Sequence, residues 1–286
     1  MKTRTVSYIA GIAAAATLGI ASLPAQAASL GAGDWNYTLD SFNDSMQGNN
    51  VGGTVYEIHG MAMKEVENRV FFAVNGNLPL AGTGSRYADD GHIGWGDLIL
   101  NFTDLGSLNN ANGSLFAVKF VDDNDSGAPA LGLYSNVGVK SVSAENGLLL
   151  NTLGDYNNHI RNNGGFPQHG DLPADTPYFN QGERIRNVID FGSKIGEVAM
   201  LNATELADLD FGSIGAGGPQ TFGFSIDRSL LPVGEFIAHL APDCGNDIIA
   251  MHGETTPTPE PASLVGLATV GLFAGRKKLR QLVASR

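Results

Sequence analysis

Short apolar segments separated by turn-forming residues are the feature of this chain that most restricts its fold. Gly, Asn, Asp and Pro stand between the segments, and these residues supply the positive φ angles or side-chain-to-backbone hydrogen bonds that turns need. Many short strands with such turns favour a sandwich, including jelly-roll arrangements. The expected strands span residues 54–63, 69–74, 97–102, 115–120, 131–134, 136–142, 187–191, 221–226, 235–240 and 247–251. We therefore expect an all-β fold with a single β-sandwich (jelly-roll-like) domain.

Two segments of the body depart from this pattern. Residues 202–207 have the composition of a helix of about a turn and a half. Residues 151–181 lack periodicity and are expected to form a long loop. The body as a whole is long enough for one domain with its own hydrophobic core.

The N-terminus has the pattern of a secretory signal peptide. Lys2 and Arg4 are positive, residues 9–23 are apolar, and Ala25 and Ala27 form a small-x-small cleavage site. This order is typical of a segment that signal peptidase removes. We expect residues 1–27 to be the signal peptide, flanking the body as a helix, and residues 28–253 to be the exported body.

The C-terminus changes from Pro-rich to apolar to basic. Residues 254–261 predict an extended linker, because closely spaced prolines cannot continue a helix or a central strand. Residues 262–275 carry no charge, but as a helix they span only about 21 Å of a ~30 Å hydrocarbon core. Basic side chains that reach the interface can cover the shortfall. We expect a transmembrane segment at 262–275 and a basic cytoplasmic tail at 276–286; the alternative is a helix that ends the globular domain.

Taken together, these C-terminal features resemble the PEP-CTERM sorting signal. The resemblance rests on Pro259, Glu260 and Pro261, the apolar span, and Arg276, Lys277 and Lys278. It implies recognition by an exosortase, a membrane-embedded cysteine transpeptidase. The enzyme would remove the tail near Pro-Glu-Pro and would release or attach the body at the cell surface.

The body is similar in motif order to the XDD-type exosortase-dependent surface proteins, which occur chiefly in cyanobacteria. The motifs that carry this similarity include residues 35–37, 56–62, 75–79, 94–98, 124–127, 132–137 and 244–247. The resemblance implies a location at the surface or in the extracellular matrix and implies no activity.

The body is strongly acidic. The chain has 17 Lys and Arg against 29 Asp and Glu. The expected processed ends, residues 1–27 and 259–286, contain seven of the positive residues and one of the negative, so residues 28–258 carry 10 against 28, a net charge of −18. Such a body does not suit non-specific nucleic-acid binding, which needs positive charge. It suits solubility and divalent cations, and a single cysteine, Cys244, excludes an intramolecular disulfide.

One loop has the start of a calcium-binding pattern. Asp122, Asn124 and Ser126 place oxygens at alternate positions, and Gly127 permits the turn. Position twelve is Leu133, so a complete EF-hand is excluded. The alternatives are a calcium site with a distant carboxylate and an acidic, solvated turn. Asp40 and Asp44, with Asn43, form a weaker oxygen cluster, as do Asp89 and Asp90.

The sequence contains no H-E-x-x-H or G-x-S-x-G motif, and we expect no enzyme activity. We expect an exported, exosortase-processed surface or matrix protein. One alternative is a carbohydrate-binding module for surface polysaccharide, with aromatic platforms drawn from Trp35, Tyr87, Trp95 and Tyr134. Another is a secreted hydrolase, in which Cys244 beside His239 or His252 is one conceivable nucleophile.

Overall fold

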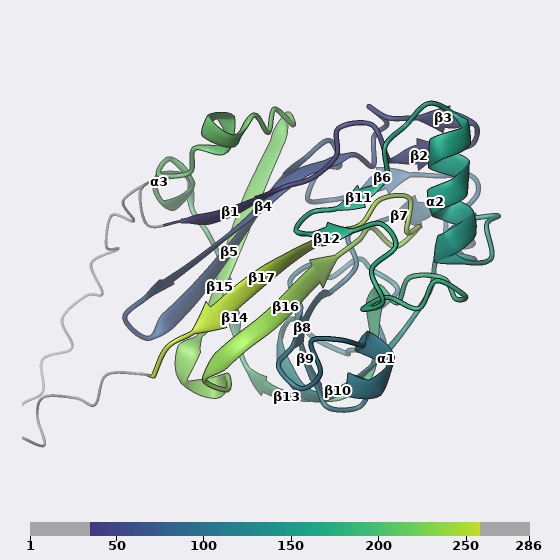
Figure 1. Ribbon diagram of the computed structural model, residues 1–286. Helices are drawn as coiled ribbons and strands as arrows, with labels where there is room; N and C mark the ends of the chain where they lie inside the picture. The colour runs from purple at the N-terminus through teal and green to yellow at the C-terminus, as the bar shows by residue number, and fades with distance from the viewer. Residues whose placement is uncertain (1–34, 258–286) are drawn as a thin grey trace, which may run out of the picture.

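Two antiparallel sheets packed face to face form the body of the protein (Figure 1). The computed structural model describes residues 35–257. The first sheet has the order β1 (Asn36–Leu39), β4 (Ile58–Val66), β5 (Arg69–Gly76), β15 (Gln220–Asp227) and β14 (Val198–Met200). The second has the order β13 (Val188–Gly196), β10 (Gly132–Lys140), β9 (Leu115–Lys119), β8 (Leu98–Asn101), β16 (Gly234–Leu240) and β17 (Ile249–Thr255). The expectation of an all-β fold is confirmed.

Three short ladders and a few helices complete the described chain. The ladders pair β2 (Met46–Gln47) with β3 (Asn50–Val51), β6 (Thr83–Gly84) with β7 (His92–Ile93), and β11 (Gln168–His169) with β12 (Leu172–Pro173). The helices are α1 (Leu108–Ala111), α2 (Leu153–Asn162) and α3 (Ala203–Leu206), with 3-10 turns η2 (Phe211–Ile214) and η3 (Arg228–Leu230). Helix α2 lies at one end of the sandwich, whereas β1 begins and β17 ends toward the opposite end (Figure 1).

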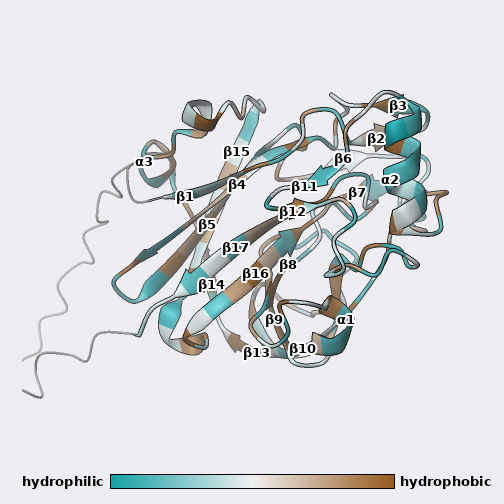
Figure 2. Cartoon of the chain, in the orientation of Figure 1, coloured by the Kyte–Doolittle hydropathy of each residue, from teal (hydrophilic) through white to brown (hydrophobic). Residues whose placement is uncertain are grey.

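The main core lies between the two sheets. Phe72 and Phe224 come from the first sheet and Phe236 from the second, and all three are fully buried. The Phe72 ring lies 6.0 Å from the Phe224 ring and 6.4 Å from the Phe236 ring, measured between centroids. Alternation of apolar and polar residues along strands such as β15 directs these side chains inward, and Figure 2 shows the resulting brown bands on the sheets.

The outer face of the second sheet is also covered. Ile99 and Ile237 of that sheet pack in a second cluster with Tyr156 and Ile160 of α2. Thr152 begins α2, because its side chain accepts a hydrogen bond from the Asp155 N–H at 3.0 Å. The expectation that 151–181 is a loop is therefore wrong. The helix is mostly hydrophilic (Figure 2), and only a narrow apolar stripe reveals its buried side.

Several strand limits also differ from expectation. Segments 131–134 and 136–142 form the single strand β10, which is irregular around Asn136, where φ is 51°. Strand β4 continues to Val66, and the turn to β5 contains Glu67 at φ 52°. The last strand ends at Thr255, beyond the expected body limit at residue 253. Strands β1 and β14 were not expected.

The expected signal peptide, the Pro-Glu-Pro motif, the segment 262–275 and the basic tail lie outside the described residues. Within residues 35–257, no helix combines the length and apolar character needed to cross a membrane.

Candidate functional site

Three aspartate side chains meet at the end of the sandwich where α2 lies. Asp40 follows β1, Asp44 lies in the next turn, and Asp247 precedes β17. One carboxylate oxygen from each lies within 4.8 Å of the others. The exposed fractions of Asp40, Asp44 and Asp247 are 3%, 0% and 0%. We call these three residues the aspartate cluster.

The β11–β12 hairpin covers two of these carboxylates with backbone N–H groups. The Gly170 N–H donates to Asp40 Oδ1 at 2.8 Å, and the Gln168 N–H donates to Asp44 Oδ2 at 2.8 Å. Gly170 has φ +59°, and a Cβ atom at this position would come within 2.3 Å of the Ala250 carbonyl oxygen. Glycine is therefore required for the turn that places this donor.

The third carboxylate joins the cluster to the two sheets. Asp247 Oδ2 accepts a hydrogen bond from the Ile58 N–H at 2.6 Å, where β4 begins, and its Oδ1 accepts one from the Ile248 N–H at 2.8 Å. The buried Tyr156 hydroxyl of α2 donates to the Asp44 carbonyl oxygen at 2.5 Å. The cluster thus lies where both sheets, the hairpin and α2 converge.

A fourth acidic side chain, Glu57, is fully buried beside the cluster. Its Oε1 accepts from the backbone N–H groups of Asp44 and Ser45, both at 3.3 Å. Its Oε2 accepts from the Ser45 hydroxyl at 2.7 Å and from the Gly53 N–H. Glu57 is therefore well supplied with donors, and it orders the loop that carries Asp44.

Burial and mutual repulsion alter the acidity of the cluster. Burial raises the pKa of Asp40 well above its ordinary range, and the charge of Asp44 raises it further. Burial, with the charge of Glu57, raises the pKa of Asp44 to about 8, although the Gln168 N–H opposes the shift. The pKa of Asp247 is also raised by burial and by the charges of Asp44, Asp40 and Glu57. A buried carboxylate keeps its charge only with compensation.

Two oxygens of the cluster have no hydrogen-bond partner. They are Asp40 Oδ2 and Asp44 Oδ1, and both are buried. Buried polar atoms are nearly always paired, so such an oxygen calls for a specific explanation. Chemically, the cluster can share protons between its carboxylates, or it can bind a cation.

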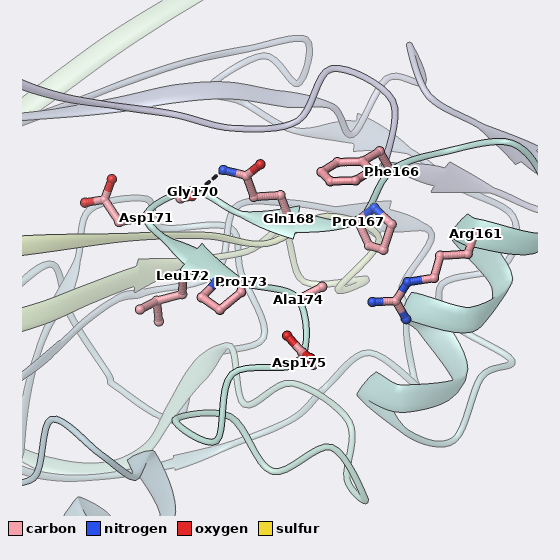
Figure 3. A pocket seen from close by; sticks show the side chains of 10 residues that line it. All are labelled: Arg161, Phe166, Pro167, Gln168, Gly170, Asp171, Leu172, Pro173, Ala174 and Asp175. Carbon is pink, nitrogen blue, oxygen red and sulfur yellow. Dashed lines mark hydrogen bonds between the residues drawn. The ribbon is translucent and has the colours of Figure 1, made fainter.

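A surface pocket of about 400 Å³ lies over the same hairpin. Figure 3 shows Arg161 of α2 on one side of it, with Phe166, Gln168 and Asp175 among the other lining residues. Asp171 also lines it, and its Oδ2 accepts hydrogen bonds from the Thr38 hydroxyl and the His252 N–H, both at 2.9 Å. The pocket is open and mixed in polarity, whereas the aspartate cluster is sealed.

The expected calcium loop has a different set of contacts. Asn124 Nδ2 donates to Asp97 Oδ1 at 3.1 Å, and the Ser126 hydroxyl donates to Asp97 Oδ2 at 2.6 Å. Asp122 is exposed, and no hydrogen bond of the described residues joins it to Asn124 or Ser126. The loop therefore satisfies the buried carboxylate of Asp97, and these contacts need no ion.

The residues considered for sugar platforms are mostly in the core. Trp35, Trp95 and Tyr134 are 7%, 0% and 1% exposed, so these three rings serve core packing, the other use open to them, and do not form platforms. Tyr87 is 66% exposed, and the Arg86 guanidinium lies 4.8 Å from the centre of its ring.

The conceivable nucleophile Cys244 is also fully buried. Burial raises the pKa of its thiol, which opposes formation of the reactive thiolate. His239 is buried too, and burial lowers its pKa to about 4. Neither group is accessible to a substrate in this structure.

The sequence identified part of the aspartate cluster. Asp40 and Asp44 stand close together in the chain, so the sequence indicates them as oxygen donors, but it does not indicate Glu57 or Asp247. No local signal identifies Asp247 as their neighbour, because only the packing of β17 beside β4 brings it near.

No protein-family model, curated protein or solved structure matches this chain.

Proposed function

We propose that this chain is an exported, exosortase-processed protein of the cell surface or extracellular matrix, and that it acts there without catalysis. The targeting part of the proposal rests on the two chain ends, which have the order expected of a signal peptide and a PEP-CTERM-like tail. The structural observation that carries it is where the folded body ends. The last strand stops at Thr255, immediately before the Pro-rich linker.

A partly buried ion pair holds this end of the body. Arg228 is 1% exposed, and its Nε donates to Glu65 Oε2 at 3.1 Å. Its Nη2 donates to the Thr256 carbonyl oxygen, and the Thr256 N–H donates to Glu65 Oε2 at 3.1 Å. We call these three residues the C-terminal clamp. It holds the chain at Thr256, so Pro259, Glu260 and Pro261 follow a firmly anchored residue.

This arrangement suits a precursor that is tethered and then cut. Signal peptidase would remove residues 1–27, the segment 262–275 would hold the precursor in the membrane, and exosortase would act near Pro259. An extended Pro-rich segment keeps a cleavage site away from folded structure. Since β17 ends far from α2 (Figure 1), a body held by its C-terminal end would turn the pocket and the aspartate cluster away from the membrane.

The intact mass of the protein from its native host, with and without the exosortase, tests this proposal. When exosortase is present, we expect the mass of a chain that runs from Ala28 to about Pro259. Any attached anchor or glycan would add to this mass. A mass that runs through Arg286 in both strains would contradict sorting and would make the tail an ordinary membrane anchor.

A second candidate, binding of surface polysaccharide, is favoured by the pocket. Phe166 is 66% exposed at its edge, and Arg161, Gln168 and Asp175 offer polar groups beside it. An exposed ring with hydrogen-bonding neighbours is a suitable surface for a sugar. Binding of the purified protein to polysaccharide from its host, compared with Phe166→Ala and with Phe191→Ala as the control at an exposed ring outside the pocket, tests this alternative. Equal binding by all three proteins would exclude the pocket.

A further inference from the structure

We propose that Asp40, Asp44 and Asp247 bind one divalent cation, with calcium as the best fit, and that the ion joins the β11–β12 hairpin to both sheets. This inference goes beyond the surface function, because it holds whether or not the tail is processed. It also places the ion away from the loop at Asp122, Asn124 and Ser126.

The geometry of the three carboxylates suits a single ion. Three carboxylates from separate parts of the chain converge, with one oxygen of each within 4.8 Å of the others. Oxygens that coordinate one calcium ion at about 2.3–2.6 Å lie within about twice that distance of one another. The three residues can therefore reach a common ion without a change of backbone.

Two oxygens of the cluster lack a hydrogen-bond donor. Asp40 and Asp44 each use one oxygen for a backbone N–H of the hairpin, and the other oxygen is buried without a donor. Leaving a buried acceptor unsatisfied is unfavourable. A cation between these oxygens would satisfy both at once.

The cluster also concentrates acidic groups in the interior of the protein. Glu57 is fully buried and accepts a hydrogen bond from the Asp44 N–H, so four acidic side chains are buried close together at this place. The salt bridges found in residues 35–257, at Glu65, Asp123, Glu183 and Glu197, include no residue of the cluster. Buried like charges repel strongly, and a bound divalent ion is the usual large positive charge at such a site.

The donors around the cluster favour a metal over shared protons. Each aspartate accepts at least one backbone N–H hydrogen bond, from Gly170, Gln168, Ile58 or Ile248. Hydrogen bonds of this kind stabilise the ionised carboxylate, which is the form that binds metal. A protonated carboxyl group would accept these backbone N–H hydrogen bonds more weakly than a carboxylate does.

The ligand chemistry selects the ion. The cluster offers carboxylate oxygens and no thiolate, so it suits hard cations such as calcium and magnesium better than zinc. Magnesium keeps several waters and demands an octahedral shell, whereas calcium accepts irregular sites with more protein oxygens. A sealed cluster formed by loops therefore favours calcium.

The test is a titration of the full-length chain, purified in mild detergent and stripped with a chelator that is then removed. Calcium chloride is added up to roughly 10 mM, above the range of extracellular calcium modules, and is followed by calorimetry and thermal unfolding. We expect saturable uptake of one ion per cluster and a rise in Tm, because a ligand that binds only the folded state stabilises it. Magnesium chloride should give a smaller rise, and an equal rise would overturn the choice of calcium.

Asp44→Asn identifies the site. The amide oxygen can still accept from the Gln168 N–H, but one negative charge is gone. We expect calcium affinity to fall about tenfold or more and most of the Tm gain to disappear. In chelator, the variant should be at least as stable as the natural protein, since one of the repelling charges has been removed.

Asp243→Asn is the matched control, because Asp243 is another buried aspartate, 2% exposed, outside the cluster. It should keep the full calcium response. If natural protein shows neither uptake nor a Tm shift, the cluster holds protons and the proposal is wrong. An unchanged calcium response in Asp44→Asn would also overturn the proposal. If Asp44→Asn does not fold, Asp40→Asn takes its place. The titration of the natural protein still decides whether an ion binds.

Discussion

Asp243 is a buried acid whose ionisation opposes folding. Its Oδ2 accepts from the Gly94 N–H at 3.0 Å, and its Oδ1 has no partner. Burial, together with the charge of Asp125, raises its pKa to about 7. The folded state therefore binds the proton more tightly than the unfolded state does.

The sign of the pH effect follows from this shift. The contribution of Asp243 to stability is fully present below its ordinary pKa near 4 and is lost as the pH rises through about 7. Asp243→Asn should flatten the fall in the free energy of unfolding over this range, so the variant should be the more stable protein at pH 8. Urea unfolding in chelator at pH 5 and pH 8 measures this. An equal change in the free energy of unfolding between pH 5 and pH 8 in the two proteins would contradict the prediction. Asp97, Asp125 and His92 also act on the pKa of Asp243, and they are the same in both proteins.

At the scale of elements, the C-terminal clamp determines how firmly β17 ends. Arg228 also donates from Nη1 to the Leu231 carbonyl oxygen at 3.1 Å, so one guanidinium joins η3, β4 and the residue after β17. Planar multidentate donation of this kind is a property of arginine that a linear side chain cannot reproduce.

Arg228→Met should therefore loosen the end of β17. We expect a loss of about 2–3 kcal/mol, since a hydrogen-bonded charge pair is broken but Glu65 keeps some contact with water. Amide hydrogen exchange should accelerate at Thr255 and Thr256. Arg184→Met is the control, because Arg184 is partly exposed and bonds to Leu150 and Asn151. Similar acceleration at Thr256 in both variants would show that the clamp does not hold the tail.

Helix α2 and the β11–β12 hairpin show where element prediction fails. The helix has few apolar residues, and the hairpin strands are two residues long. Neither has a pattern long enough to stand out, because tertiary packing supplies most of the stability of such elements. Yet these two elements cover the second sheet and the aspartate cluster.

At the scale of the whole molecule, the two sheets are joined by a central group of aromatic rings. Phe72→Ala should lower the free energy of unfolding by about 3–5 kcal/mol, because it removes a buried ring and leaves a cavity between the sheets. Denaturant unfolding measures this loss. Phe191→Ala is the control, since Phe191 lies on an edge strand and is 57% exposed. A loss at Phe72 no larger than that at Phe191 would show that the sheets are not joined here.

The sequence by itself determined the strand-rich character of this protein and most of its strands. It also determined the succession of charged, apolar and Pro-rich segments at the two ends of the chain. These properties are local, since they depend on alternation, turn residues and short motifs that neighbouring positions display. The tertiary structure decided which acidic residues meet. Asp40 and Asp44 are close in the chain, but Asp247 reaches them only through the pairing of β17 with β16 and its packing beside β4. Long-range packing buries these three aspartates at one place, and no local sequence pattern predicts that they meet.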